Sequence, residues 1–301
     1  MQRLLRESLD GFAADLGGTK IAAARVARGI VEERLQTATD GKAGPDAQLA
    51  TIAGLLQKLG HAPGAPLGVA VAGRIDGEES WHAVNRGILE AVQGFPLASA
   101  LERIVGAVTC CNDAAAAAFA EAHFGAGRGC RHFAYLTVST GVGGGIVLGG
   151  QLIQSQNGLA GHVGFVSSPF GRNACGSGRY GTVESTAAGR AIAAEAAAQG
   201  HAEADARAVF AAAAQGQAWA EAIIEGSAKA VATLIADLAT ILGLDRVAIG
   251  GSVGLADGYL DRVRTALAEE PELFRVELAR AELGHDSALL GALALQRLQA
   301  G

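Results

Sequence analysis

The 301-residue sequence is poor in aromatic, sulfur-containing and basic residues. Phe, Trp and Tyr make up 5% of it, methionine occurs once, and four cysteines are too few for a disulfide framework in a chain of this length. Asp and Glu outnumber Lys and Arg by 30 to 24, which argues against the basic surface that non-specific nucleic-acid binding needs. We therefore expect no nucleic-acid partner.

Long apolar runs are also missing. No stretch reaches the roughly 18 consecutive apolar residues of a membrane span, and the opening string MQRLLRESLDG is too polar for a signal-peptide core. We expect no membrane contact and a cytoplasmic location. Half of the residues are apolar and 18% are charged, which is typical of a folded chain with a core for one large domain or two smaller ones.

Glycine is in excess, at 43 of 301 positions, and it marks a repeated pattern. In FAADLGGTKIAAARV, two apolar runs flank Gly17 and Gly18. Far later, strands expected at 133–139 and 146–148 flank a glycine turn at 141–145. A repeat this distant predicts duplicated domains rather than a solenoid.

Apolar spacing elsewhere predicts an alternation of strands and helices, and hence an α/β fold. Further strands are expected at 30–35, 67–72, 106–111 and 246–249, and helices at 45–59, 186–198, 206–214, 218–242, 257–268 and 287–298. Asn112 and Asp113 open an alanine-rich helix. No linker rich in Pro, Ser or charge divides the chain, so the hinge should be structured and lie near Asp113.

Glycine turns can bind phosphate, because without a Cβ the backbone N–H groups approach phosphate oxygens closely. A single hairpin of this kind is more often just a tight turn, and no phosphate loop of the G-x-x-x-x-G-K-[ST] type is present. The candidates of the first turn are Asp15, which could hold a metal through water, and Gly17, Gly18, Thr19 and Lys20. Those of the second turn are Ser139, Thr140, Gly141, Val142, Gly143, Gly144 and Gly145.

Four strings, in this order and spacing, resemble the ROK family of repressors, open reading frames and sugar kinases: DLGGTK (15–20), Asn112-Asp113, STGVGGG (139–145) and Gly250-Gly251-Ser252. The resemblance covers about residues 11–298, and the ordered set is specific although each string alone is weak. It implies two RNase H-like domains of the actin- and hexokinase-like ATPase fold, with an interdomain cleft. The expected domains are 11–113 with a C-terminal helix at about 286–299, and 114–285.

The family implies transfer of a phosphoryl group from Mg-ATP to a sugar hydroxyl. Asp113 resembles its catalytic base, because the attacking hydroxyl needs a carboxylate to take its proton. The alternative is that Asp113 merely caps the helix that follows. Asp15 resembles the carboxylate on the metal side, where Mg²⁺ is held mostly through water. Gly250 and Gly251 resemble the loop beside the nucleoside.

Sugar kinases of the family typically carry G-x-A-G-E-x-G-H and then C-x-C-G-x-x-G-C-x-E, whose His and three Cys hold a structural zinc. Here the strings read GLAGHVGF (158–165) and CGSGRYGTVE (175–184). Phe165, Ser177 and Thr182 thus replace three of the four ligands, and Cys175 alone cannot close a tetrahedral site. We predict no structural zinc, with the loop held by packing around Phe165 and Tyr180.

The same register implies the sugar contacts. His162 stands where the family has a sugar-binding Glu, as in its bacterial N-acetylmannosamine kinases, and imidazole can donate as well as accept. The alternative interpretation is that His162 is exposed to solvent or only packs against its neighbours. Glu184 keeps the second Glu position, and its alternative is a first-turn helix carboxylate. The remaining sugar contacts that the resemblance implies are Gly73, Asn85 and Asn112.

The expected reaction is phosphorylation of N-acetylmannosamine to its 6-phosphate, in sialic-acid breakdown, by a homodimer. Ile88 stands near where relatives often carry a sugar-binding Asn, so glucose, N-acetylglucosamine and fructose stay open as substrates. A sugar-sensing repressor would carry an N-terminal helix-turn-helix, and only about ten residues precede Phe12. Intact Asp15, Thr19, Lys20 and Asp113 argue against a catalytically dead sugar-binding relative.

Overall fold

The computed structural model describes residues 6–85 and 87–299. Its framework is two mixed sheets of five strands each. The strands of the first sheet are Gly11–Leu16 (β1), Lys20–Ala27 (β2), Ile30–Ala38 (β3), Leu67–Val71 (β4) and Thr109–Asn112 (β8). Those of the second are His132–Val138 (β9), Val142–Leu148 (β10), Gln151–Leu152 (β11), Arg246–Gly250 (β12) and Glu277–Arg280 (β13).

The two sheets share one pairing scheme. Their orders are β3-β2-β1-β4-β8 and β11-β10-β9-β12-β13. In the first, β1 pairs antiparallel with β2 and parallel with β4. In the second, β9 pairs antiparallel with β10 and parallel with β12. The two glycine hairpins are therefore equivalent elements of two similar sheets, which confirms the predicted repeat.

Each sheet buries one face against its own helices. Leu67, Val69 and Val71 of the first sheet pack with Ile52 and Leu101 of the helices on that face. These helices are Pro45–Lys58 (α2) and Leu97–Val105 (α3). The second sheet shares a hydrophobic core with the long helix α8, which spans Ala218–Leu242. Around α8 lie Glu184–Ala187 (α5), Gly189–Ala198 (α6), Ala206–Ala214 (α7), Gly251–Gly254 (α9) and Tyr259–Leu267 (α10).

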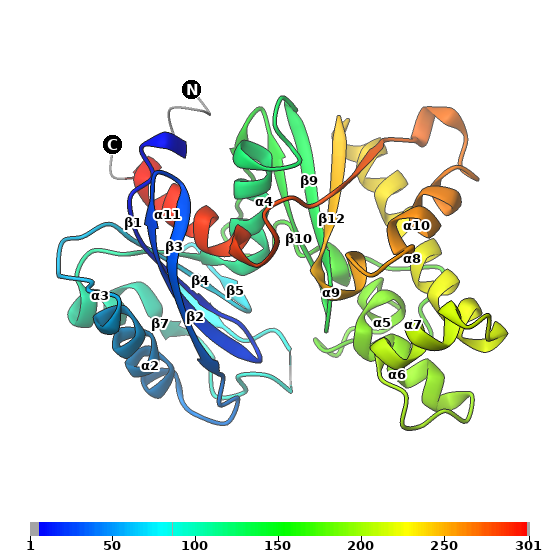
Figure 1. Cartoon of the computed structure of the whole chain (residues 1–301), viewed down its shortest axis with the longest axis horizontal. Helices are drawn as coiled ribbons and strands as arrows, with labels where there is room; N and C mark the ends of the chain where they lie inside the picture. Colours follow the sequence, from blue (N-terminus) through cyan, green and yellow to red (C-terminus); the bar gives the residue numbers. More distant parts are fainter. Residues whose placement is uncertain (1–5, 86, 300–301) are drawn as a thin grey trace.

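Two helices lie between the sheets (Figure 1). They are Asp113–Phe124 (α4), which follows β8 directly, and Ser287–Gln299 (α11). The two helices pack on each other, α11 also lies against β1 and β4, and α4 lies against β9 and β10. Small residues allow this close approach: a Cβ on Gly291 would collide with the backbone of Ala116. The chain thus passes from one sheet to the other at Asp113, whose side chain lies where the two halves meet.

The sequence located most elements, with three corrections. Gly143, Gly144 and Gly145, expected in a turn, lie inside strand β10, because a strand packed against a helix can use residues without side chains. The strand expected at 106–111 begins only at Thr109, and the helix expected at 186–198 is divided into α5 and α6. A small sheet was not expected; its strands are Arg74–Ile75 (β5), Ser80–His82 (β6) and Phe95–Pro96 (β7).

Three short 3₁₀ helices complete the described elements, and the first of them lies in the sugar-site string. They are Val163–Phe165 (η1), Glu272–Phe274 (η2) and Gly284–Asp286 (η3). Within residues 6–85 and 87–299, no helix is both long and apolar enough to cross a membrane.

Candidate active site

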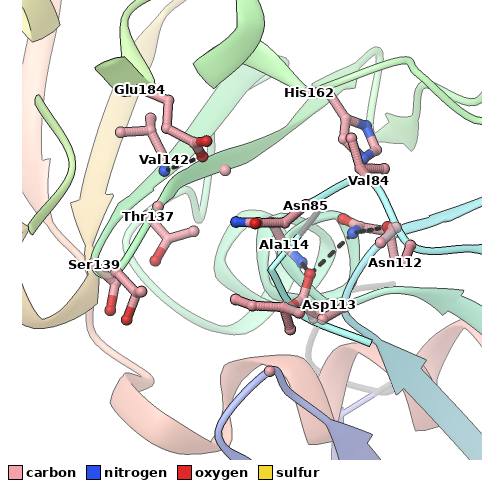
Figure 2. Close-up of a pocket in the computed structure, with 18 of the residues that line it drawn as sticks. Val84, Asn85, Asn112, Asp113, Ala114, Thr137, Ser139, Val142, His162 and Glu184 are labelled. Carbon is pink, nitrogen blue, oxygen red and sulfur yellow. Dashed lines mark hydrogen bonds between the residues drawn. The ribbon is translucent and has the colours of Figure 1, made fainter. Parts of the chain in front are cut away.

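A cavity of about 340 Å³ lies between the two halves of the molecule. Its walls come from both sides, with Thr19 and Asn85 from the first half and Thr140 and His162 from the second. The predicted site residues that the structure brings to this cavity are Gly18, Thr19, Gly73, Asn85, Asn112, Asp113, Thr140, Gly141, Val142, Gly143, Gly144, His162 and Glu184. Figure 2 shows this cavity, with Asn112 and Asp113 at the junction of β8 and α4.

Asp113 is the first residue of α4, and Asn112 is its N-cap. The Oδ1 of Asn112 accepts from the N–H of Ala115 at 2.9 Å, which satisfies one of the free donors of the first turn. The N-cap position thus belongs to Asn112, although the carboxylate of Asp113 also accepts from a first-turn N–H, that of Ala114. Asp113 in addition lines the cavity.

The carboxylate of Asp113 is fixed through one of its two oxygens. Oδ1 accepts from the N–H of Ala114 at 2.8 Å and from Nδ2 of Asn112 at 2.9 Å. The same Nδ2 also donates to the carbonyl of Gly73, at 2.7 Å. Neither of the two bonds to Asp113 uses Oδ2. Desolvation by burial raises the pKa of Asp113 to about 6, against the lowering effect of these donors.

Asp15, at the end of β1, does not line the cavity but interacts electrostatically with Asp113. Burial, and then the negative charge of Asp113, raise the pKa of Asp15 to about 7, while the nearby Arg34 acts in the opposite direction. Its Oδ1 is buried and makes no hydrogen bond with any described residue. A buried carboxylate oxygen without a partner, near a second carboxylate, is a site that fits a divalent cation. The residues present thus fit the Mg²⁺ that the sequence led us to expect.

The first glycine turn faces the cavity with only some of its predicted residues. Gly18 and Thr19 line it, whereas Gly17 and Lys20 do not, and Lys20 is exposed. The N–H of Gly17 is used within the turn, where it donates to the carbonyl of Lys20 at 2.9 Å. A Cβ on Gly18 would lie 2.7 Å from Cγ2 of Ile88. The turn therefore presents its backbone at Gly18 and Thr19, with Ile88 packed against it.

The second turn reaches the cavity with Thr140 to Gly144, but Gly145 is turned away. A Cβ on Gly145 would collide with the Cβ of Ala118 and lie 3.0 Å from Cα of Ala115, both on α4. Gly145, expected at the nucleotide, is thus not among the residues that line this cavity. Its role is to let α4 approach β10 closely, which positions Asp113 at the start of that helix.

Gly250 and Gly251 also lie outside the cavity lining, directly behind it. Gly251 has φ of 84°, and a Cβ there would lie 2.7 Å from Oγ1 of Thr137. In the next position, Oγ of Ser252 lies 3.1 Å from Oγ of Ser139. Thr137 and Ser139 themselves line the cavity. The glycine pair thus supports the wall of the cavity and does not contribute to its surface.

Glu184 is buried and is held by backbone N–H groups of two segments, the start of strand β10 and the loop at Gly176. Its Oε2 accepts from the N–H of Val142 at 3.0 Å, and its Oε1 from the N–H of Gly176 at 3.1 Å. Glu184 is the first residue of α5. It therefore also occupies the first-turn position that was its alternative interpretation. Glu184 thus ties the second glycine turn to the loop that carries Cys175. Figure 2 shows it at the cavity with its bond to Val142.

His162 lies at the cavity and stacks on Phe165. The ring centroids are 5.8 Å apart and the planes are inclined by 23°. Burial lowers the pKa of His162, with the carbonyl of Gly73 acting in the opposite direction. The ring is therefore neutral at physiological pH and offers one donor and one acceptor. Phe165 lines the cavity beside it, so the residue at the former zinc position supports the histidine.

The loop around Cys175 is held by hydrogen bonds. Across the described ranges, no group of three or more His, Cys, Asp or Glu side chains is arranged to hold a metal ion. Sγ of Cys175 lies 3.0 Å from Oγ of Ser177. Thr182 is fully buried, and its Oγ1 accepts from the N–H of Ser185 at 3.2 Å. Tyr180 is 68% exposed, which corrects the expectation that the loop packs around it.

One cationic lining residue was not predicted. Arg190, in the first turn of α6, lines the cavity. Its Nε lies 3.4 Å from the carbonyl of Thr140 and its Nη1 lies 3.4 Å from Oδ1 of Asn85. Arg190 was missed because it lies in an alanine-rich helix with no motif of its own.

The two similar sheets with a ligand-sized cavity between them define a protein of the actin-like ATPase fold, which confirms the predicted fold class. The ROK hexokinase of Thermus thermophilus is similar in structure, with a TM-score of 0.83, 32% identity and coverage of 97% of this chain and 100% of that one. A ROK glucokinase of Streptomyces griseus, in complex with glucose and AMPPNP, has a TM-score of 0.81 at 28% identity, covering 96% and 99%.

The model of the ROK family matches residues 12–298, so the chain belongs to the ROK family. It is 44% identical over 287 residues to the N-acetylmannosamine kinase of Citrobacter koseri, covering 94% of this chain and 97% of the relative. The N-acetylmannosamine kinase of Escherichia fergusonii is 44% identical over 289 residues, with the same coverage.

Proposed function

We propose that the protein is an ATP-dependent sugar kinase that phosphorylates N-acetylmannosamine on its 6-hydroxyl. The observation that carries the proposal is the 44% identity to N-acetylmannosamine kinases over nearly the whole chain. It is supported by His162, which lies at the cavity at the position where many relatives use a glutamate. Location in the cytoplasm and a place in sialic-acid breakdown belong to the same proposal.

In the proposed reaction, Asp113 is the general base. The 6-hydroxyl attacks the γ-phosphorus of ATP, a new O–P bond forms, and the bond from that phosphorus to the β,γ-bridging oxygen breaks to release ADP. Oδ2 of Asp113 takes the hydroxyl proton, since both hydrogen bonds from Ala114 and Asn112 fall on Oδ1. The raised pKa, about 6, keeps Asp113 ionised at neutral pH and basic enough to assist the attack.

We assign the nucleotide to the side of the cavity where the two glycine turns face each other. Thr19 and Thr140 would contribute hydroxyls, and the backbone from Gly141 to Gly144 would approach the phosphates. Asp15 would hold Mg²⁺, mostly through water. When bound, the ion neutralises charge on the phosphates and orients them. Gly250 and Gly251 would limit the cavity on the nucleoside side, through Thr137 and Ser139.

We assign the sugar to the opposite part of the cavity. Glu184 accepts one backbone N–H on each oxygen, and each oxygen can accept a further bond from a sugar hydroxyl. His162, with its depressed pKa, can both donate and accept. The sugar contacts that complete this assignment are Gly73, Asn85 and Asn112. Ile88 lies at the cavity where an amide was expected, so a different hexose is the second candidate substrate.

The domain division is part of the proposal. We infer a smaller domain of residues 11–113 with the helix at about 286–299, and a larger domain of 114–285. The packing of α11 on β1 and β4 supports the assignment of that helix to the first domain. We also propose a homodimer, which light scattering on the purified protein would test.

The first experiment is ADP release with Mg-ATP across N-acetylmannosamine, N-acetylglucosamine, glucose, mannose and fructose. We expect N-acetylmannosamine to have the highest kcat/KM. His162→Glu is the informative variant, since it restores the carboxylate of other relatives. It should lower kcat/KM for N-acetylmannosamine more than for glucose. A wild type that prefers glucose would refute the substrate, and turnover of no sugar would refute the kinase.

A further inference from the structure

The charge of the cavity does not match the ligand that the proposed function requires. The acidic side chains that line it are Asp113 and Glu184, and Asp15 lies close behind. ATP brings a polyanionic triphosphate into this space. The lysine of the first glycine turn, Lys20, is exposed and is not part of the lining. A second cationic residue at the cavity would therefore add to the charge that a metal ion supplies to the phosphates.

Arg190 is the one lysine or arginine among the described residues that line the cavity. Because burial lowers the pKa of His162, that ring does not add a cation at neutral pH. Arg190 lies in the first turn of α6, and the N–H of the preceding Gly189 donates to the carbonyl of Ser139 at 2.7 Å. This bond fixes the start of α6 to the second glycine turn. The guanidinium is therefore carried on an element attached to the turn that we assign to the phosphates.

The present contacts of Arg190 are weak enough to be exchanged. Both of its hydrogen bonds measure 3.4 Å, beyond the usual range for N–H···O, and both acceptors are neutral. Its side chain is exposed rather than packed in place. A phosphate oxygen is a stronger acceptor than an amide oxygen, and guanidinium pairs with phosphate through two parallel bonds. Exchange of these acceptors for phosphate oxygens is thus favourable.

We propose that Arg190 binds the terminal phosphates of the nucleotide and stabilises the transferring phosphoryl group. This inference rests on the proposed function, because it assumes that ATP enters the cavity. When ATP binds, the Arg190 guanidinium exchanges the carbonyl of Thr140 for a phosphate oxygen. Thr140 belongs to the second glycine turn, against which we place the phosphates. The hydrogen bond to Asn85 is then released or retained according to how the sugar binds. If Arg190 only held Asn85 in place, its loss would weaken sugar binding and leave nucleotide binding unchanged.

The test measures binding without turnover. Arg190→Gln and Arg190→Lys are titrated calorimetrically with AMPPNP, ADP, AMP and N-acetylmannosamine. Loss of a charged hydrogen-bond pair should weaken AMPPNP by about 10- to 100-fold in Arg190→Gln. ADP should lose less, and AMP and the sugar should be unchanged. Arg190→Lys should keep part of the affinity, as a point charge without the two parallel bonds.

Arg207→Gln is the matched control, since Arg207 is exposed on α7 and outside the cavity lining. It removes the same charge and should leave every affinity unchanged. Unchanged AMPPNP binding in Arg190→Gln would overturn the inference. So would a loss confined to the sugar, because it would show that Arg190 only holds Asn85. Wild-type turnover on the sugar panel separates these results from failure of the kinase proposal itself.

Discussion

The β1–β2 hairpin and the β9–β10 hairpin hold equivalent places in their sheets, yet they use glycine for different purposes. In the first, Gly18 lies in the turn, lines the cavity and packs against Ile88. In the second, Gly143 and Gly145 lie within strand β10. Cβ atoms there would meet the Cβ atoms of Ala114 and Ala118 on α4. In the first hairpin, glycine exposes backbone to the cavity. In the second, glycine mainly allows helix α4 to approach the strand.

This difference bears on how the two carboxylates, Asp15 and Asp113, are placed. Asp15 is part of β1 itself, so the first hairpin carries its own acidic residue. Asp113 comes from α4, and the glycines of β10 allow that helix to lie against the second sheet. Glycine-rich strings of similar appearance can thus have separate roles, one in the surface of the cavity and one in the placement of the residue that we assign as base.

The largest expected effect compares the two carboxylates directly. Asp113→Asn should lower kcat by about 10²- to 10⁴-fold with little change in sugar affinity, because an amide cannot take the proton. Asp15→Asn should raise the Mg²⁺ concentration needed for half-maximal rate and lower kcat less. Steady-state ADP release at varied Mg²⁺ measures both. An Asp113→Asn variant with wild-type kcat would refute the base assignment, and thermal melts would show that both variants are folded.

The next effect tests the two uses of glycine. Gly145→Ala forces a Cβ into Ala118 and should reduce the free energy of unfolding by about 1–3 kcal/mol, since overpacking a helix contact has no open space to relax into. Gly18→Ala displaces only the Ile88 side chain, so it should cost less stability and weaken AMPPNP binding more. Gly41→Ala, which meets no atom within 4 Å, is the control. Urea unfolding and calorimetry measure the two quantities, and equal stability losses at Gly145 and Gly18 would contradict the distinction.

A smaller, graded effect follows from the pKa of Asp113. Burial raises it to about 6, and the base acts only when it is ionised. Hence kcat/KM for the sugar should be level above that pH and fall as the pH decreases through about 6, by about tenfold for each further unit. A pH–rate profile at saturating Mg²⁺ measures it. A profile that stays flat down to pH 5 would show that no group with this pKa governs the reaction.

The smallest expected effect concerns the loop around Cys175. Because hydrogen bonds that involve Ser177, Thr182 and Glu184 hold this loop, chelation with EDTA should shift Tm by less than about 1 °C. The variant Phe165→His, Ser177→Cys, Thr182→Cys restores the ligand set of the family and should bind zinc. Elemental analysis and melting curves measure both. Stoichiometric zinc in the wild type, lost together with stability on chelation, would refute the prediction.

Much of the fold could be predicted because it depends on local pattern. Alternating apolar residues around Gly17 and Gly18 indicated a hairpin, and the apolar spacing of 218–242 indicated one long helix, both of which the structure contains. The glycines at 143–145 were misplaced in a turn, since glycine next to glycine looks the same in a turn and in a strand. Only the neighbouring helix distinguishes the two.

The candidate site divides in the same way. Residues in a recognisable string, such as Asp113 and His162, were found from the sequence and lie at the cavity. Arg190 has no motif around it, so no local signal indicated that it lines the same space. Gly145 stood inside a motif and yet faces α4. Which side of a strand or helix a residue presents to a cavity depends on what packs on the other side.

The sequence by itself determined the repeated hairpins, the succession of strands and helices, and the loss of three of the four zinc ligands, because each depends on residue type and on spacing along the chain. The tertiary structure alone decided which of those residues share one cavity. It gave the helix cap to Asn112, left Oδ1 of Asp15 buried without a hydrogen-bond partner among the described residues, and brought Arg190 to the carbonyl of Thr140. These outcomes depend on contacts between residues distant in the chain, which short-range patterns do not encode.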